Sequence, residues 1–260
     1  MIFESHAHYD DEAFDGDREE LLHSLSAQGV GTVINVAASV DGIESTVRLA
    51  EEYPFVYAAV GVHPDEVGEM DQGTLERMRR LAREDKVVAI GEIGLDYYWD
   101  KEKHELQKEW FRRQLDVARQ EKLPFIIHSR EAAADTLQVA REERVGEIGG
   151  VVHCFSYGVE LAREYLNMGL YLGIGGVVTF KNARKLKEVA EYAPLSALLL
   201  ETDSPYLAPV PHRGKRNDSG NLPLVAQAIG EIKGISPEEV IRVTEENGRR
   251  LFYKIDKNGK

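Results

Sequence analysis

The sequence is poor in several features that define particular classes of protein. It has a single cysteine, Cys154, among 260 residues, which excludes an internal disulfide framework and any CxxC redox or zinc motif. No apolar run approaches the roughly 18 residues of a membrane helix, so we expect no membrane association. The first residues lack a basic stretch and enter an apolar segment at once, which predicts no secretory signal and a cytoplasmic location.

Positive charge is also scarce. The chain has 32 lysine and arginine residues against 45 aspartate and glutamate residues, a net charge of −13. Broad, nonspecific binding to nucleic acid or to anionic membranes normally needs a basic face, so the composition disfavours both. It leaves open a narrow site at which metal ions supply the positive charge locally.

What the chain has is a repeated alternation of short apolar segments and charged, amphipathic stretches of helical length. Together with Ile2 and Phe3 there are eight β-rich apolar segments, the others at 32–36, 56–60, 87–90, 125–127, 150–152, 170–174 and 197–200. The helical stretches between them are 15–27, 42–52, 73–84, 101–121, 131–143, 159–168 and 182–193. This alternation indicates βαβ units and a parallel sheet. Eight units in about 200 residues favour a closed (β/α)8 TIM barrel, with an open doubly wound sheet as the alternative.

The chain continues past the eighth apolar segment without a recognisable linker. A proline-containing loop at 204–223 leads into two further helical patterns, 224–233 and 237–251. The second begins with Ser236, a helix-capping residue type, followed by Pro237 in the first turn. We therefore expect one α/β domain over residues 1–260 and no obligate protein partner.

Residues of the types that bind metals follow five of the apolar segments. His6 and His8 are two residues apart, so on an extended strand both imidazoles point to the same side. Such a pair alone is equally typical of hydrogen-bonded surface histidines. The C-terminal ends of barrel strands face one cleft, which brings six residues together: His6, His8, Glu92, His128, His153 and Asp203. Four imidazoles and two carboxylates suit two ions that share a carboxylate and a hydroxide, and burying them without cations would be costly.

Several motifs, taken in order, resemble the TatD family of metal-dependent deoxyribonucleases. They are His6-Ala7-His8 with Asp10, Gly91-Glu92-Ile93-Gly94-Leu95-Asp96-Tyr97-Tyr98, His128-Ser129-Arg130, His153-Cys154-Phe155-Ser156, Glu201-Thr202-Asp203-Ser204-Pro205-Tyr206 and Pro211-His212-Arg213-Gly214-Lys215-Arg216-Asn217. The match runs from Ile2 to Phe252. It differs after Asn217, where Asp218-Ser219-Gly220 stands in place of the family's acidic residue and proline, which affects only local substrate contacts.

The resemblance implies a TIM-barrel hydrolase of the amidohydrolase type that acts on DNA with Mg²⁺. It also implies that the six residues divide between two metals. His6, His8, Glu92 and Asp203 would hold one ion, and Glu92, His128 and His153 would hold the other. The four imidazoles by themselves suit Zn²⁺ or Mn²⁺.

Two carboxylates are the candidates for catalysis. A pair of divalent ions would lower the pKa of a shared water and neutralise the oxygens of a phosphodiester. Asp203 either orients this water and accepts its proton or serves as a ligand alone, and Glu92 bridges the ions. Glu201 lies two residues before Asp203, so on an extended strand the two side chains share a face. Glu201 either orients a ligating imidazole from behind or forms a structural salt bridge.

Phosphate recognition also needs donors from the protein. Arg130, near the fifth strand end, either donates paired hydrogen bonds to a phosphate or forms a salt bridge with Glu131 or another acidic residue of the rim. Arg213, Lys215 and Arg216 form the densest basic cluster, which either brings positive charge to the cleft or is a solvated loop.

Histidine and aromatic residues next to the strand ends are further candidates for substrate contacts. His63 follows the third segment and either contacts substrate or begins a helix. The aromatic run 97–99 either stacks a base or packs over the barrel rim.

The leading hypothesis is a metal-dependent phosphodiesterase, most simply a deoxyribonuclease that trims exposed ends of DNA. The alternative keeps the metals and changes the bond: a two-metal esterase or amidohydrolase acting on a carboxylic ester or amide, including an aminoacyl ester on RNA. A third hypothesis is a metal-binding barrel without catalysis, which is disfavoured because a purely structural site is normally closed.

Overall fold

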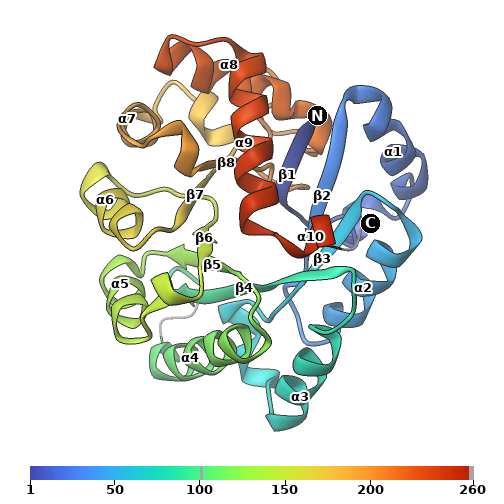
Figure 1. Cartoon of the computed structure of the whole chain (residues 1–260), viewed down its shortest axis with the longest axis vertical. Coiled ribbons are helices and arrows are strands. Elements are labelled where there is room, and N and C mark those ends of the chain that lie inside the picture. The colour runs from blue at the N-terminus through green and yellow to red at the C-terminus, as the bar shows by residue number, and fades with distance from the viewer. Residues whose placement is uncertain (100–101, 258–260) are drawn as a thin grey trace.

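The sheet is the framework of the molecule. The structure is a computed structural model that describes residues 1–99 and 102–257. Its strands are parallel, and each pairs with the next along the chain, in the order β1 to β8 (Figure 1). They span β1 (Ile2–Ala7), β2 (Val30–Val36), β3 (Val56–Val60), β4 (Val87–Asp96), β5 (Phe125–Arg130), β6 (Gly150–Val152), β7 (Tyr171–Ile174) and β8 (Leu198–Leu200). The sheet is nearly closed on itself, so the predicted (β/α)8 barrel is confirmed and the open sheet is not.

Helices surround the sheet at the positions that the alternation predicts. They span α1 (Arg18–Leu25), α2 (Gly42–Glu52), α3 (Gln72–Leu81), α4 (His104–Glu121), α5 (Ala133–Glu142), α6 (Val159–Asn167), α7 (Arg184–Tyr192), α8 (Leu222–Lys233), α9 (Pro237–Leu251) and α10 (Lys254–Lys257). The helix expected over 101–121 starts at a residue outside the described ones. Ser236 accepts a hydrogen bond from the N–H of Glu239, as its capping position predicts. Within the described part of the chain, no helix is long and apolar enough to cross a membrane.

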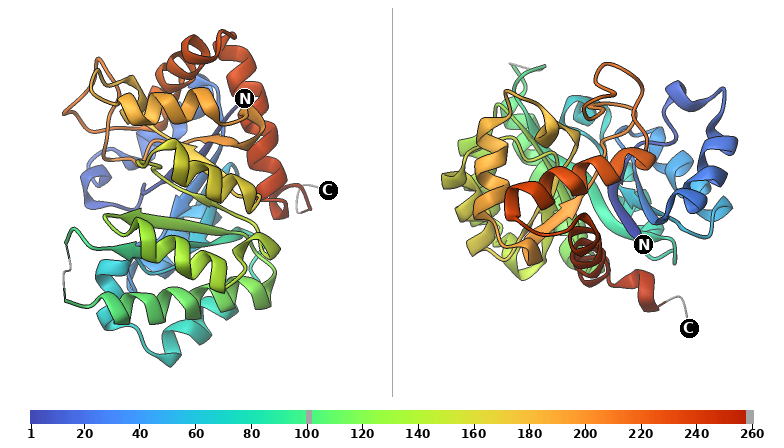
Figure 2. Two further views of the ribbon diagram at one scale, coloured as in Figure 1. Left: turned by 90° about the vertical axis from the view of Figure 1, so that its left-hand side faces the viewer. Right: turned by 90° about the horizontal axis from the view of Figure 1, so that it is seen from above.

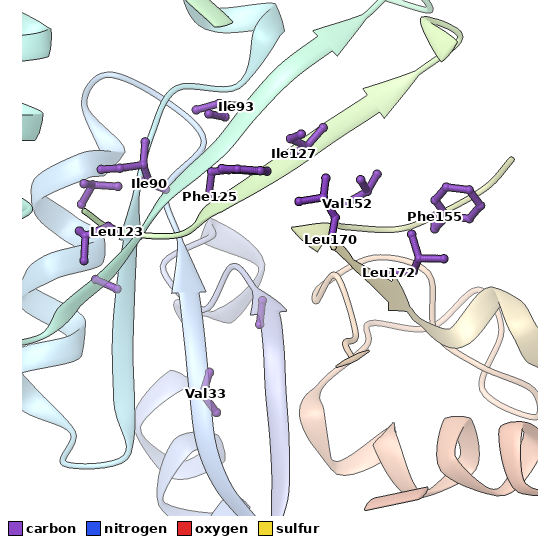
Figure 3. Close-up of a cluster of buried hydrophobic side chains, with 14 of the residues drawn as sticks. Val33, Ile90, Ile93, Leu123, Phe125, Ile127, Val152, Phe155, Leu170 and Leu172 are labelled. Carbon is purple, nitrogen blue, oxygen red and sulfur yellow. The ribbon is translucent and has the colours of Figure 1, made fainter. Parts of the chain in front are cut away.

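Two apolar layers fill the barrel and its surroundings. One cluster combines helix residues with strand residues such as Phe125, Ile127, Val152 and Leu172, and it includes Ile90 and Ile93 on either side of an irregularity in β4 (Figure 3). The intervening residues point into the barrel, where Phe3, Ile34, Val88, Ile126, Val151 and Leu199 belong to a second cluster. This alternation is the period of two that a barrel strand imposes.

The C-terminal helices close the end of the barrel at which the strands begin. Leu251, Phe252 and Ile255 join the inner apolar cluster, and the ring of Phe252 stacks on Phe3 with centroids 5.8 Å apart. Figure 2 shows α9 and the C-terminal end on one side of the barrel. The opposite end, where the strands finish, is left for polar side chains.

The seam between the first and last strands is built differently from the rest of the sheet. β8 ends at Leu200, and the pairing with β1 is a single bridge between Ala7 and Ser204. The N–H of Asp203 donates to the carbonyl of His6 at 3.0 Å. The loop after β8 therefore completes the barrel, and it does so beside two predicted ligands.

A buried carboxylate replaces the missing backbone ladder at this seam. Glu4 accepts hydrogen bonds from the N–H of His6 at 3.1 Å, from the N–H of Thr202 at 2.9 Å and from the hydroxyl of Thr202 at 2.7 Å. The hydroxyl of Ser219 donates to the same carboxyl at 2.9 Å and contacts the hydroxyl of Tyr9. Burial raises the pKa of Glu4 to about 7. One glutamate thus connects β1, the loop after β8 and the short helix η7 (Ser219–Asn221) that precedes α8.

Candidate metal centre

The first two ligand candidates come from the end of β1. His6 lies on the strand and His8 follows it, and both side chains point to the same side, with their Nε2 atoms 3.1 Å apart. The Nδ1 atom of His8 lies 2.7 Å from the carbonyl of Val36 on β2. That carbonyl accepts a hydrogen bond from the Nδ1–H group, so the lone pair of His8 is presented at Nε2.

Glu92 reaches both pairs of histidines from β4. Its carboxylate oxygens lie 3.7 Å from Nε2 of His6 and 3.7 Å from Nε2 of His8. They also lie 3.5 Å from Nδ1 of His128, on β5, and 2.8 Å from Nε2 of His153, which follows β6. The carboxylate therefore sits at the centre of the cluster.

Asp203 reaches the cluster from a turn. The sequence suggested that Glu201 and Asp203 share a strand face, but the strand ends at Leu200 and Asp203 has a left-handed backbone with φ 58°. Its Oδ1 atom lies 3.7 Å from Nε2 of His6 and 3.5 Å from Nε2 of His8. Such a conformation costs about 1–3 kcal/mol and persists only where the surroundings impose it.

The spacing of these atoms fits divalent cations. Two nitrogen ligands on one tetrahedral ion, each with a bond of about 2.0–2.1 Å, lie about 3.3 Å apart. The Nε2 atoms of His6 and His8 are 3.1 Å apart, as are Nδ1 of His128 and Nε2 of His153. Oε2 of Glu92 is buried 2.8 Å from Nε2 of His153, and within the described residues it forms no hydrogen bond of suitable geometry. Ligand atoms of His6, His8 and Asp203 all lie within 4.8 Å of one another, as do those of His6, Glu92 and His153.

The pKa values in the cluster indicate that two of its histidines carry protons, which a bound cation would replace. Burial opposes the charged form of His8, yet its hydrogen bond to Asp203 and the charge of Glu92 raise its pKa to about 10. Burial likewise opposes a charge on His128, but Asp96 and Glu92 raise its pKa to about 9. Burial also opposes the charge of Glu92, but His153 and His128 hold its pKa well below its ordinary value. Protons thus balance the carboxylates, and a metal ion that binds here displaces them.

Asp96 belongs to the site although no role was predicted for it. Its Oδ2 atom lies 3.0 Å from Nε2 of His128, and its Oδ1 atom accepts the N–H groups of Tyr98 and Trp99 at 2.8 and 3.2 Å. A carboxylate on one imidazole nitrogen directs the other towards the metal. The available signal was its place in the motif at 91–98, four residues after Glu92.

Glu201 lies behind His153. One carboxylate oxygen accepts the N–H of Cys154 and lies 3.9 Å from Nδ1 of His153. Burial and the charge of Asp203 raise the pKa of Glu201 well above its ordinary value. Gly173 makes room for this side chain, because a Cβ there would lie 2.0 Å from Oε2.

Two further predicted contacts, His63 and Arg130, lie beside His128. The ring of His63 is 4.3 Å from that of His128, and its Nδ1 accepts the N–H of Asp65 as it begins the short helix η3 (Pro64–Glu69). Burial and the charge of His128 lower the pKa of His63 to about 4, so it is neutral. The guanidinium of Arg130 lies 4.0 Å from the ring of Tyr98. Contacts of either residue with substrate stay predictions.

The basic loop after β8 is engaged with the protein itself. Arg216 forms a bidentate ion pair with Asp17 at 2.7 and 2.6 Å, and Arg213 lies 4.5 Å from the ring of Phe180. Lys215 is exposed. Their contacts with substrate also stay predictions, with Arg216 already paired in this structure.

An eight-stranded barrel with imidazoles and carboxylates gathered at its C-terminal strand ends is the architecture of a metal-dependent hydrolase. The comparisons with known proteins agree. A family model described as "TatD related DNase" matches residues 3–253, and the chain belongs to this TatD family.

Relatives of similar length share this assignment. The chain is 44% identical over 252 residues to the metal-dependent hydrolase YabD of Bacillus subtilis (strain 168), covering 97% of this chain and 99% of YabD. It is 42% identical over 256 residues to the metal-dependent hydrolase YcfH of Escherichia coli (strain K12), covering 97% and 96%. The crystal structure of YjjV, a TatD homologue from Escherichia coli K12, superposes with a TM-score of 0.91 at 31% identity, covering 97% and 98%. The protein is a metal-dependent hydrolase of the TatD family.

Proposed function

We propose that this hydrolase is a deoxyribonuclease that removes nucleotides from exposed ends of DNA. The observation that carries the proposal is the central position of Glu92, which reaches the histidines of β1 and those that follow β5 and β6. A phosphodiester carries a negative charge that such a shared centre is suited to offset. The family's description as DNases supports the same substrate class.

The proposed ligand sets follow the two histidine pairs. His6, His8, Glu92 and Asp203 hold one ion, and Glu92, His128 and His153 hold the other. When bound, divalent ions of Zn, Mn or Mg lower the pKa of a water towards neutrality and offset the charge on the phosphate.

The protein's own residues have distinct tasks in this scheme. Asp203, close to both histidines of β1, orients the attacking water and takes its proton. Glu201 holds His153 from behind. Neutral His63 and the fork of Arg130 donate hydrogen bonds to the phosphate.

The basic loop acts farther from the reacting bond. Arg213, Lys215 and Arg216 attract the phosphates of the strand as it approaches an otherwise acidic protein. Arg216 exchanges its pairing with Asp17 for a phosphate in this scheme, whereas Lys215 is already exposed.

A cleavage assay with protein stripped by a chelator and reloaded with Mg²⁺, Mn²⁺ or Zn²⁺ tests the proposal. Labelled single-stranded DNA should be shortened only by the reloaded protein. Glu92→Ala and His128→Ala should abolish cleavage, and His23→Ala, on the outer helix α1, should not.

The same preparation should be offered a carboxylic ester, including an aminoacyl ester on RNA. Metal binding with intact ligands and ester hydrolysis, but no cleavage of DNA, would replace the deoxyribonuclease with the esterase hypothesis.

A further inference from the structure

Two large aromatic side chains stand exposed at the rim of the metal centre. Tyr98 and Trp99 follow β4 and expose 42% and 66% of their surface. Trp110, by contrast, is 7% exposed. A tryptophan that is open to water near a metal centre is suited to hold a flat apolar group.

The backbone of this aromatic pair is fixed to the metal centre by one carboxylate. Oδ1 of Asp96 accepts the N–H groups of Tyr98 and Trp99, and Oδ2 lies 3.0 Å from Nε2 of His128. Asp96 is 1% exposed. The position of the aromatic pair relative to the ligand His128 is therefore set by two short hydrogen-bonded links through a buried group.

The guanidinium of Arg130 lies closer to the ring of Tyr98 than to that of Trp99. It lies over the ring of Tyr98, 4.0 Å from the centroid, and 5.5 Å from that of Trp99. The two rings meet edge to face, 4.7 Å apart at 85°. Tyr98 thus holds the guanidinium, while Trp99 keeps most of its surface open.

We propose that Trp99 stacks the unpaired base of a nucleotide beside the scissile bond, while Arg130, held by Tyr98, contacts its phosphate. This rests on the proposed function and names the substrate feature that it selects. Aromatic stacking tolerates any base, since every base has a π face. A base inside a duplex already stacks on its neighbours and is paired, so this platform favours single-stranded or frayed ends.

Binding to two matched oligonucleotides tests the platform. One is a thymidine tetranucleotide and the other a chain of equal length without bases, and both carry phosphorothioate linkages that resist hydrolysis. Fluorescence anisotropy with the metal-loaded protein should show about tenfold tighter binding of the base-bearing strand.

Substitutions should remove this difference selectively. Trp99→Ala should weaken binding of the base-bearing strand about tenfold and leave the baseless strand unchanged, and Trp99→Phe should retain most of the preference. Tyr192→Ala is the matched control, because Tyr192 is also exposed and also lies beside an arginine, Arg163, but at the far end of α7.

Equal affinity of the wild-type protein for both strands, or an equal loss for both in Trp99→Ala, would overturn the proposal. Failure of the proposed function is separate and visible: the metal-loaded wild-type protein would leave an unmodified DNA strand intact.

Discussion

The Oδ2 atom of Asp96 lies 3.0 Å from Nε2 of His128, on the side of the imidazole away from the other ligands. The remaining nitrogen, Nδ1, lies 3.1 Å from Nε2 of His153 and 3.5 Å from Glu92. An ionised carboxylate accepts a hydrogen bond from Nε2–H, which keeps the proton on Nε2 and leaves a lone pair on Nδ1. The tautomer of a ligand is therefore set by a residue outside the ligand cluster.

Replacing Asp96 by asparagine should weaken metal binding about 10- to 100-fold. The amide oxygen can still accept the N–H groups of Tyr98 and Trp99, which turns the amino group towards His128 and moves its proton to Nδ1. Metal affinity by competition with a chromogenic chelator measures the effect. Asp135→Asn is the control, because Asp135 bonds the hydroxyl of Tyr97 without contacting His128. Unchanged affinity in Asp96→Asn would show that the carboxylate does not set the tautomer.

Replacing Glu4 by glutamine should lower the stability of the protein only slightly, whereas replacing it by leucine should lower it more. One oxygen of Glu4 accepts two backbone N–H groups, and the other accepts the hydroxyls of Thr202 and Ser219. A glutamine can keep the first pair and donate to the hydroxyls. We expect Glu4→Gln to lower the free energy of unfolding by less than about 1 kcal/mol and Glu4→Leu by at least about 2 kcal/mol. Urea denaturation measures both, and equal stability of the two variants would refute this role.

Adding one methyl group at Gly173 should disturb the metal centre from behind. The new Cβ would lie 2.0 Å from Oε2 of Glu201, so the carboxylate must leave its place beside His153. We expect Gly173→Ala to lower the free energy of unfolding by about 1–3 kcal/mol and to weaken metal binding. Gly16→Ala serves as the control, since nothing lies within 4 Å of its added Cβ. Glu201 has no positioning role if metal affinity is the same in both variants.

Truncation of Phe252 should destabilise the barrel without changing the activity of the folded protein. Its ring is fully buried against Phe3 at the end of the barrel opposite the ligands. We expect Phe252→Ala to lower the free energy of unfolding by about 3–5 kcal/mol, far more than Tyr192→Ala at an exposed position. Activity per folded molecule, measured well below the unfolding transition, should stay at the wild-type level. A specific loss of activity would show that the C-terminal helices influence the site.

The barrel was predictable because hydrophobic periodicity is a local signal. The apolar segments marked the strands, but they ended where polar residues began: the segment at 87–90 is the start of β4 (Val87–Asp96). The pairing with β5 is irregular between Ile90 and Ile93, where Gly91 and Glu92 lie, and the strand continues because 93–96 pair with 127–130 beyond it. A local pattern also could not assign a role to Asp96, because its function depends on His128, a partner 32 residues away.

The turn after β8 could not be predicted from spacing. Alternation placed Glu201 and Asp203 on one strand face, whereas the left-handed conformation of Asp203 sends the two carboxylates to different partners. Glu4 was missed because a single glutamate in an apolar strand gives no sign of its four donors. These contacts come from tertiary packing at the seam.

The central claim is that the cluster around Glu92 holds the divalent ions on which phosphodiester cleavage depends. The most direct test titrates the metal-free protein with Mn²⁺ while metal content and cleavage of single-stranded DNA are followed together. Cleavage should be absent at the start, rise with bound metal and level off at two ions per chain, and Glu92→Ala should stay inactive throughout. Cleavage by the metal-free protein, or metal binding to the wild-type ligands with no cleavage at any loading, would contradict the claim.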